Sequence, residues 1–487
     1  MHKMTPELIF GTFIVYTFVI LLISWITSRK ADNQSFFIGN HKSPWFIVAY
    51  GMIGASLSGV TFISIPGWVS TTGFSYFVIV LGYVVGYAVI TTVLLPIYYK
   101  LNLTSIYTYL DIRFGKSAYK TGSAYFLLSR IIGASFRMFL VISVLQVFVF
   151  DHFGIPFWST AILFMVIIQI YTIRGGIKTI IWTDSLQTTF MLAAVVITVF
   201  MIAQNMDTSI VELTNLVGNS SLSEMFITDI NSKQNFIKLF LSGIFITIVM
   251  TGLDQDMMQK NLSCRNLNDA KKNMTTLSLI LVPVNLIFLF LGAILFLFAA
   301  KNGIQLPEAT DHAFPFIAFN YLGPVAGIIF IIGLISAAYS SADSALTSLT
   351  TSFTIDILEL DKKYSDNGKL LKKNRYLIHI GMSILIIFVI ISFKLINNQA
   401  IIAQLFTFAG YTYGPLLGLY SFGLLTSYKA NGKLIPVIAL ISPLISYALS
   451  RYSEVLLNGY QIGFELLLIN GLITFIGLYL TRKQFTN

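Results

Sequence analysis

A run of hydroxyl side chains around one carboxylate is the stretch of this sequence best suited to chemistry. The run lies inside a long apolar segment and contains Ser336, Ser340, Ser341, Asp343, Ser344, Thr347 and Ser348. Helical spacing places several of these hydroxyls on one face, with Asp343 on its flank. Hard alkali cations prefer oxygen ligands, and hydroxyls with a single carboxylate suit a weakly held monovalent ion. The run therefore predicts an exchangeable cation site, with interhelical hydrogen bonding as the alternative explanation of the serines.

Three further ionisable residues, Arg130, Arg137 and Asp184, also fall within long apolar segments. An ionisable side chain at membrane depth costs at least roughly 2.5 kcal/mol on insertion scales, so each one requires a role. The two arginines share one helical face, and a buried guanidinium can anchor a carboxylate through two hydrogen bonds. Pairing with a protein acid is the alternative for either arginine. Asp184 fits either a cation site or a helix cap at the membrane interface.

Motifs of enzyme active sites are missing from the sequence. There is no Gly-x-Ser-x-Gly nucleophile elbow, no phosphate-binding loop and no His-Glu-x-x-His zinc motif. The single cysteine, Cys264, excludes an internal disulfide and leaves no Cys/His cluster for zinc. An intramembrane aspartyl enzyme would need two acids such as Asp184 and Asp343 to meet across a site. We expect that the protein is not an enzyme.

The elements that position these residues are membrane helices. Hydrophobic residues make up 56% of the chain and charged residues only 11%, whereas about a quarter of an ordinary soluble domain is charged. A helix needs about 20 mostly apolar residues to cross the hydrocarbon, and the apolar segments are too long for barrel strands. The sequence predicts an all-α membrane protein with about thirteen transmembrane helices, near residues 8–27, 46–72, 74–98, 122–150, 156–173, 180–204, 237–254, 276–299, 318–352, 376–393, 400–425, 434–449 and 462–481.

The positive charges indicate the orientation of these spans. The net charge of +10 would suit a nucleic-acid partner, but most of the 31 Lys and Arg lie in alternate loops, from Arg29 and Lys30 to Arg482 and Lys483. By the positive-inside rule these loops are cytoplasmic, so the amino terminus is expected outside and the carboxyl terminus in the cytoplasm. In the first span the charges follow the apolar run, which argues against a signal peptide. We expect a bacterial inner (plasma) membrane protein that binds no nucleic acid.

Two spans are unusually small and polar at their centres. The second contains Gly51, Gly54, Ser56, Ser58, Gly59 and Thr61, and the seventh contains Ser242, Gly243, Thr247, Thr251 and Gly252. Unwound backbone at such places offers carbonyls to a cation and a helix N-terminus to an anion. Close packing of helices through small residues is the alternative.

Four segments of the chain resemble the sodium:solute symporter family. They are SGVTFI at 58–63, GGIKTIIWTDSLQ at 175–187, GLDQDMMQKNL at 252–262 and AAYSSADS at 337–344. The resemblance covers most of the chain and implies one transporter domain over residues 1–487. That domain would comprise a LeuT-type five-plus-five inverted-repeat core over 46–425, an extra N-terminal helix at 8–27 and two C-terminal helices over 434–481.

The resemblance also implies binding residues. The main sodium site would use the carbonyls of Gly54, Leu57 and Ala337 with the hydroxyls of Ser340 and Ser341. A second cation site would use Asp184, Ser340, Asp343 and Ser344. Because Asp343 stands where related proteins commonly have a hydroxyl, it would either strengthen that site or bring in a proton. The solute-binding pocket would be lined by Ser56, Ser58, Thr61, Thr247, Thr251, Tyr411 and Thr412. Arg130 or Arg137 would bind a carboxylate of the solute.

These expectations add up to secondary active transport. The resemblance implies a symporter that uses sodium, its only metal ion, to import a small organic solute across the lipid bilayer, and that functions as a monomer. The arginines favour a carboxylated solute such as sialic acid or another sugar acid. A neutral sugar or inositol and a proline-like amino acid are the alternatives within the family, and a channel or a membrane solute sensor is the alternative from another class.

Overall fold

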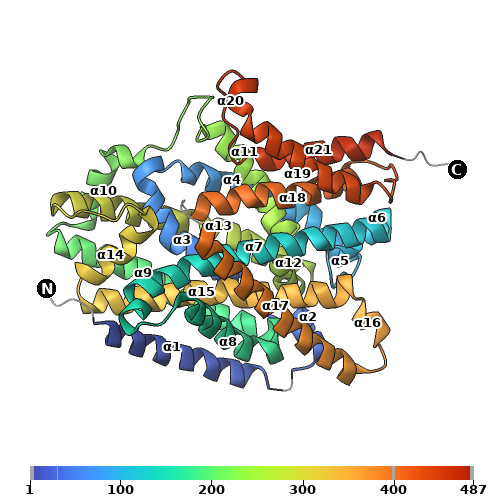
Figure 1. The fold of residues 1–487 in the computed structure, drawn as a ribbon, viewed down its shortest axis with the longest axis horizontal. Helices are drawn as coiled ribbons and strands as arrows, with labels where there is room; N and C mark the ends of the chain where they lie inside the picture. Colours follow the sequence, from blue (N-terminus) through green and yellow to red (C-terminus); the bar gives the residue numbers. More distant parts are fainter. Residues whose placement is uncertain (1–4, 30, 397–400, 483–487) are drawn as a thin grey trace.

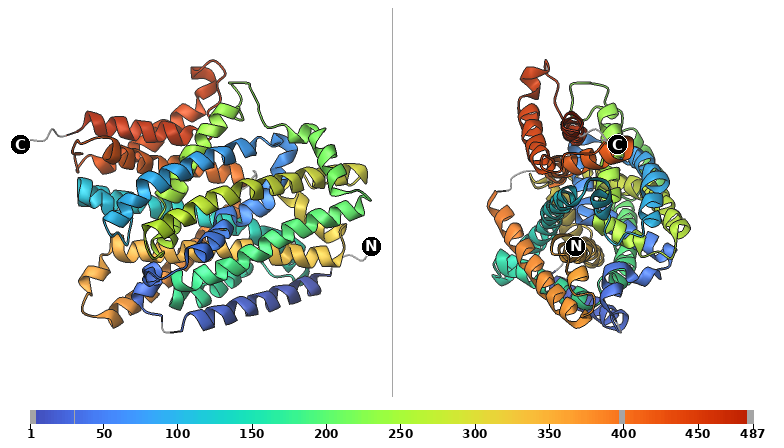
Figure 2. Two further views of the ribbon diagram at one scale, coloured as in Figure 1. Left: turned by 180° about the vertical axis from the view of Figure 1, so that it is seen from behind. Right: turned by 90° about the vertical axis from the view of Figure 1, so that its right-hand side faces the viewer.

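The computed structural model describes residues 5–29, 31–396 and 401–482. Within these ranges the chain forms helices and no β-strand, apart from two isolated bridges. Most of the long helices run along one common direction (Figure 1), and this is equally visible from behind and from the end of the bundle (Figure 2). The expectation of an all-α protein is therefore confirmed for the described residues.

A helix is present at the position of each predicted span. The long helices are α1 (Pro6–Thr27), α3 (Trp45–Thr72), α4 (Tyr76–Val89), which continues through a π-helical turn into α5 (Leu95–Lys100), α7 (Lys116–Phe148), α8 (Phe157–Gly175), α9 (Ile177–Asn205), α11 (Phe236–Thr247), α13 (Leu267–Lys301), α15 (Pro324–Ser352), α17 (Gly368–Ile396), α18 (Ile401–Leu425), α19 (Ile435–Arg451) and α21 (Leu466–Leu480). Shorter helices occupy the connections: α2 (Asn33–Ile38), α6 (Thr108–Phe114), α10 (Ile210–Gly218), α12 (Gln255–Leu262), α14 (Ala313–Asn320), α16 (Leu360–Lys363) and α20 (Ser453–Leu456).

Length and composition identify fewer certain membrane crossings than thirteen. Among the described residues, nine helices are long and apolar enough to span a membrane, and the bent pair of α11 with α12 passes the same test when its two parts are taken together. The apolar helices α19 and α21 are shorter, with 17 and 15 residues. An integral membrane protein is established by these spans, whereas the count of thirteen stays a prediction.

Both predicted helix interruptions are present. Helix α3 is broken at Ser58, whose φ of 57° and ψ of 175° are not helical. Helix α11 passes through the π-helical turn η5 (Ile248–Gly252) and then bends by 62° into α12. The carboxylate of Asp254 accepts hydrogen bonds from the backbone N–H groups of Asp256 and Met257, which caps the start of α12. The small, polar centres of these two spans thus mark real breaks, because there the chain leaves the helical path inside the bundle.

Helix α15, which carries the hydroxyl run, lies in the protein interior. It packs against α9, α3 and α7, and all its residues from Gly333 to Ser352 are buried. The first turn of α1 and the last turn of α21 lie at opposite ends of the bundle (Figure 1). The polar face of α15 is therefore available only to other helices, to ions and to small molecules.

Candidate functional site

A cavity of about 90 Å³ lies where the two broken helices face each other. Its walls come from α3, α4, α7, α11 with η5, α12, α13 and α18. Seven of the nine predicted solute residues line it: Ser56, Ser58, Thr61, Arg130, Arg137, Thr247 and Thr251. The tertiary structure thus brings together hydroxyls from both interrupted spans and two guanidinium groups from α7.

Arg130 is paired with protein acids. Its guanidinium contacts Oδ2 of Asp256 directly, and its Nη1 lies 3.7 Å from Oδ2 of Asp254. The hydroxyl of Tyr413 donates a hydrogen bond to the same oxygen of Asp254. All of these side chains are buried. The alternative of pairing with an acid therefore holds for Arg130, whose charge is already balanced.

Arg137 has a different environment. Its side chain is 8% exposed, and its Nε lacks a hydrogen-bond partner. Among the described residues no carboxylate forms an ion pair with it. Nearby Arg130 repels its charge, and Asp254 attracts it without forming an ion pair with it. Because a buried cation without a counter-ion is costly, Arg137 is the guanidinium of the cavity that can accept an anionic group.

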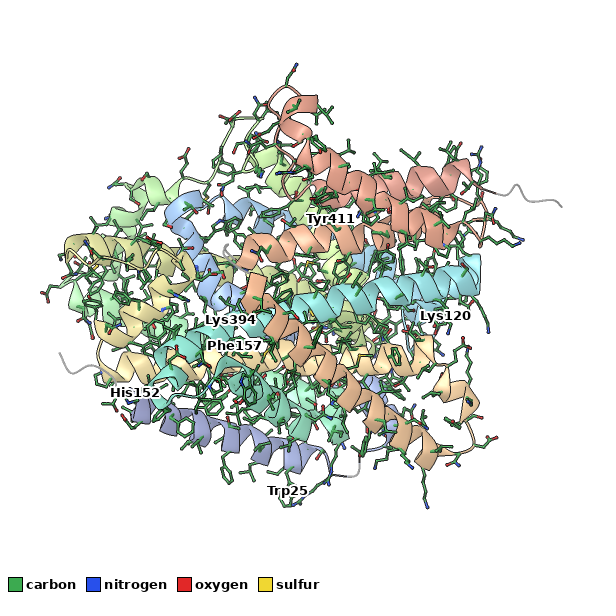
Figure 3. The ribbon with its side chains drawn as sticks, viewed as in Figure 1. Trp25, Lys120, His152, Phe157, Lys394 and Tyr411 are labelled. Atoms are coloured by element: carbon green, nitrogen blue, oxygen red, sulfur yellow. The ribbon has the colours of Figure 1, made fainter. Side chains whose placement is uncertain are left out.

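Two predicted solute residues lie elsewhere. Tyr411 packs against Tyr447 of α19, with ring centroids 6.1 Å apart, and lies on the side of α18 that faces α19 and α21 (Figure 3). Thr412 donates a hydrogen bond to the carbonyl of Phe408 and lies outside the main cavity. The register of α18 directs Leu405 and Phe406 to the cavity and Tyr413 to Asp254, whereas Thr412 lines a small neighbouring pocket with Arg130 and Arg137. A solute role for Tyr411 and Thr412 stays a prediction.

Several residues of the main sodium site predicted from the resemblance lie close together. Ser341 Oγ donates a hydrogen bond of 2.9 Å to the carbonyl of Ala337. A Cβ added to Gly54 would lie 3.4 Å from Ser340 Oγ, so the first half of α3 meets this face of α15 closely. Leu57 is buried in the turn before the break at Ser58. Neutral hydroxyl and carbonyl oxygens of this kind fit a weakly held monovalent cation.

Of the four residues predicted for a second cation, Asp184, Asp343 and Ser344 have protein partners, whereas Ser340 Oγ and Asp184 Oδ1 have no hydrogen-bond partner among the described residues. Oδ2 of Asp184 lies 2.7 Å from Nζ of Lys260, and Ser340 adjoins the same carboxylate. Asp343 accepts hydrogen bonds from the Tyr171 hydroxyl at 3.0 Å and from the backbone N–H of Ser344 at 2.6 Å.

Ser344 completes this set of contacts. Its Oγ donates to Oδ2 of Asp256 at 3.2 Å and is 3.1 Å from the carbonyl of Ser340. In this arrangement the tethered ammonium of Lys260 faces Oδ2 of Asp184.

The burial of Lys260 corrects the charge distribution expected from the sequence. Lys260 falls between the predicted spans 237–254 and 276–299, in one of the basic loops assigned to the cytoplasm, but its side chain is 1% exposed. The reason is the bend after η5, which turns α12 back into the bundle, where Asp184 compensates the buried charge. Three residues of the resemblance segment 252–262 thus contribute charges to the interior that sequence reasoning missed: Asp254, Asp256 and Lys260.

Other residues of the cavity were also missed. They are Tyr76, Tyr83, Tyr87, Asn285 and Phe406. Of these, the three tyrosines carry a usable signal, because positions 76, 83 and 87 fall on one helical face of the third span. Asn285 and Phe406 are isolated in apolar sequence and carry none.

Sequence comparisons with known proteins all find sodium-coupled transporters. The sequence model of the sodium:solute symporter family matches residues 36–432. The sodium/sialic acid symporter NanT of Aliivibrio fischeri is 27% identical over 95% of this chain and 90% of its own. The sodium/sialic acid symporter SiaT of Proteus mirabilis is 25% identical over 90% and 88%. Mouse sodium-coupled monocarboxylate transporter 1 is 25% identical over 86% of this chain and 70% of its own.

Solved structures share the fold. A substrate-bound, outward-open Na⁺-coupled sialic acid symporter superposes with a TM-score of 0.83 at 22% identity, covering 98% of this chain and 99% of the other. The nucleobase-cation symporter Mhp1 in a closed conformation gives a TM-score of 0.55 at 14% identity, covering 91% and 93%. The expected LeuT-type architecture is confirmed by these superpositions.

Proposed function

The chain belongs to the sodium:solute symporter family, and we propose that it imports a carboxylated organic solute, such as a sugar acid of the sialic acid type, together with sodium. As a member of this family it is an integral membrane transporter that uses sodium as its coupling ion, and it is not an enzyme. The identity of the solute, the binding residues and the orientation of the chain belong to the proposal.

The carboxylate preference rests on one observation, the buried guanidinium of Arg137 without a protein counter-ion. A solute carboxylate can accept two parallel hydrogen bonds from a guanidinium, which gives both affinity and orientation. Two kinds of similar proteins, sodium/sialic acid symporters and sodium-coupled monocarboxylate transporters, have names that specify carboxylated solutes. We therefore assign the solute carboxylate to Arg137, and the polar contacts to Ser56, Ser58, Thr61, Thr247 and Thr251.

Charge balance explains why such a solute would travel with sodium. Around the cavity the positive charges of Arg130 and Arg137 equal in number the negative charges of Asp254 and Asp256. An anionic solute adds one negative charge to this neutral set, and a sodium ion at Ser340 and Ser341 restores neutrality. Because the two ligands lower each other's electrostatic cost, each tightens the binding of the other to the same extent.

The sodium site also has a mechanical part in the proposal. Sodium would be held by the carbonyls of Gly54, Leu57 and Ala337 and the hydroxyls of Ser340 and Ser341. These ligands come from α3 on one side and α15 on the other. The ion would therefore hold the first half of α3 against α15 and place the break at Ser58, together with the neighbouring solute hydroxyls, in the binding geometry.

The cavity volume indicates the conformation. At about 90 Å³ the cavity is smaller than the roughly 300 Å³ at which pockets for small molecules begin. The helices must therefore separate before a sugar acid can bind. In proteins with inverted repeats this happens by rocking of one group of helices against another around a central site.

The placement in the membrane follows from the basic loops. The alternate loops rich in Lys and Arg would be cytoplasmic, with the amino terminus outside and the carboxyl terminus inside. The opposite positions of the first turn of α1 and the last turn of α21 support this assignment (Figure 1). The proposal includes a functional monomer.

Uptake into proteoliposomes tests the proposal. Purified protein is reconstituted, and entry of labelled N-acetylneuraminic acid is measured with an inward sodium gradient and with the same gradient of potassium. The methyl ester of the solute is the matched control, since it removes only the carboxylate charge. We expect sodium-driven uptake of the acid and weak uptake of the ester. Equal transport of both compounds would contradict the carboxylate assignment, and uptake in potassium would contradict sodium coupling.

A further inference from the structure

Beyond the main sodium site, helix α12 is attached to α15 by two hydrogen bonds. The hydroxyl of Ser344 donates to Oδ2 of Asp256 at 3.2 Å, and Nε2 of Gln259 donates to Oγ1 of Thr351 at 2.9 Å. Asp256 and Gln259 lie three residues apart and thus on one face of α12. These two contacts delimit a short stretch of the interface between the helices.

Three buried oxygen atoms of this stretch have no hydrogen-bond partner among the described residues. They are Oδ1 of Asp256, Oε1 of Gln259 and Oγ1 of Thr347. All three residues are fully buried. Thr347 lies three residues after Ser344 and four before Thr351, so helical spacing places it on the same face of α15, between the two contacts. The three oxygens therefore lie along the same short stretch of the interface.

Thr347 also departs from the behaviour of its neighbours. The hydroxyls of Thr350, Thr351 and Thr354 each donate to the carbonyl four residues earlier, at 2.6–2.9 Å. This is the usual way in which a threonine in a buried helix satisfies its hydroxyl. The hydroxyl of Thr347 makes no such bond. A buried polar atom without a partner costs about 1–3 kcal/mol, so a group of three calls for a ligand that binds oxygen.

The ligand types at this place favour a monovalent cation. Asp256 binds the guanidinium of Arg130 through Oδ2, and its Oδ1 has no hydrogen-bond partner among the described residues. A carboxylate, an amide carbonyl and a hydroxyl are ligands typical of hard cations. A divalent ion usually recruits more carboxylates than this interface offers, so a monovalent ion is the better match.

We propose that Asp256, Gln259 and Thr347 form a further monovalent-cation site between α12 and α15. It lies roughly 9 Å along the α15 axis from Ser341, at 1.5 Å per residue. The identification of the ion as sodium, and of this end of α15 as cytoplasmic, rests on the proposed function. Sodium that leaves Ser340 and Ser341 towards the cytoplasm binds to the oxygens of Asp256, Gln259 and Thr347 before it is released.

Sodium binding to the purified full-length protein tests the site. The number of bound ²²Na⁺ ions per chain and the sodium-dependent rise of the apparent Tm are measured at constant ionic strength with N-methylglucamine as the replacement. Thr347→Val keeps the shape of the side chain and removes its oxygen. Thr198→Val is the matched control, because Thr198 is buried and its hydroxyl already donates to Ala194 at 2.7 Å.

We expect Thr347→Val to bind one sodium ion fewer than wild type and Thr198→Val to bind the same number. Thr347→Ser keeps the hydroxyl and should bind the wild-type number of sodium ions. If Thr347→Val does not fold, Thr347→Ala is used in its place as the variant without the hydroxyl and is compared with Thr347→Ser. An unchanged number in the variants that lack the hydroxyl would overturn the site and would mean that the three oxygens hold water only. That result leaves the wild-type sodium-driven uptake intact, so failure of this site and failure of the proposed function are distinguishable.

Discussion

The ammonium group of Lys260 lies 2.7 Å from Oδ2 of Asp184, and both side chains are buried. The pair joins α12, the helix after the bend, to α9. Removing one partner of such a pair leaves an uncompensated charge in the interior and costs about 3–5 kcal/mol. The pair therefore governs both the stability of the bundle and the charge available beside the main sodium site.

Replacing Lys260 tests this role. Lys260→Met should lower the apparent Tm markedly, and the loss should be smaller in sodium than in N-methylglucamine, because a sodium ion can then neutralise Asp184. The double variant Lys260→Met/Asp184→Leu should recover much of the stability, since neither charge remains. Lys116→Met is the control: its ion pair with Glu359 spans 3.7 Å with a 75% exposed lysine, so the change should cost no more than about 1 kcal/mol. A Tm of Lys260→Met equal to that of this control would show that the buried pair is unimportant.

Replacing the two arginines of α7 should affect different properties, solute affinity for Arg137 and stability for Arg130. Arg137→Gln removes the proposed carboxylate anchor, and losing a charged hydrogen-bonded pair costs about 2–5 kcal/mol, which corresponds to at least about a 30-fold rise in the KM for an acidic solute. Its sodium-dependent thermal stabilisation should stay at the wild-type level. Arg130→Gln instead leaves Asp254 and Asp256 without their counter-charge, so it should lower the apparent Tm. Uptake of the acid with an unchanged KM in Arg137→Gln would remove the support for the anchor.

The hydroxyls of the main sodium site can be removed together. Ser340→Ala/Ser341→Ala should abolish the dependence of solute uptake on the sodium gradient and the thermal stabilisation by sodium. Ser348→Ala is the control, because this hydroxyl lies on the same helix, is buried and already donates to Ala345 at 2.9 Å. Both readouts should be unaffected in the control. Wild-type sodium dependence in the double variant is the outcome that would disprove the site.

Gly54 is packed tightly against Thr188, so the effect of replacing Gly54 should depend on the side chain at position 188. A Cβ at this position would lie 2.3 Å from Oγ1 of Thr188, which accepts a hydrogen bond from the Gly54 N–H at 3.1 Å. Overpacking of this kind costs about 1–3 kcal/mol, so Gly54→Ala should lower both the apparent Tm and the sodium affinity. Gly54→Ala/Thr188→Ala removes the clash and should recover part of both losses. If the second change brings no recovery, the contact with Thr188 is not the cause.

Features that depend on local sequence were predictable. The membrane class follows from composition, and the helices follow from apolar length, because crossing the hydrocarbon imposes both on every span. The breaks at Ser58 and after Thr247 were visible as runs of small and polar residues. The position of the α15 serines on one helical face was also predictable from their spacing, whereas their role as a cation site stays a prediction.

Features that depend on which distant segments meet were decided only by the tertiary structure. The sequence offered two equivalent arginines, and only the return of Asp254 and Asp256 to α7 distinguishes the paired Arg130 from the unpaired Arg137. Lys260 read as a loop residue until the bend after η5 buried it against Asp184. The register of α18, which directs Tyr413 and not Tyr411 to the site, is likewise set by packing against its neighbours. Composition and spacing describe one segment at a time, whereas the partner of a buried charge comes from another segment, and the cost of leaving that charge unpaired ties the two together in the folded bundle.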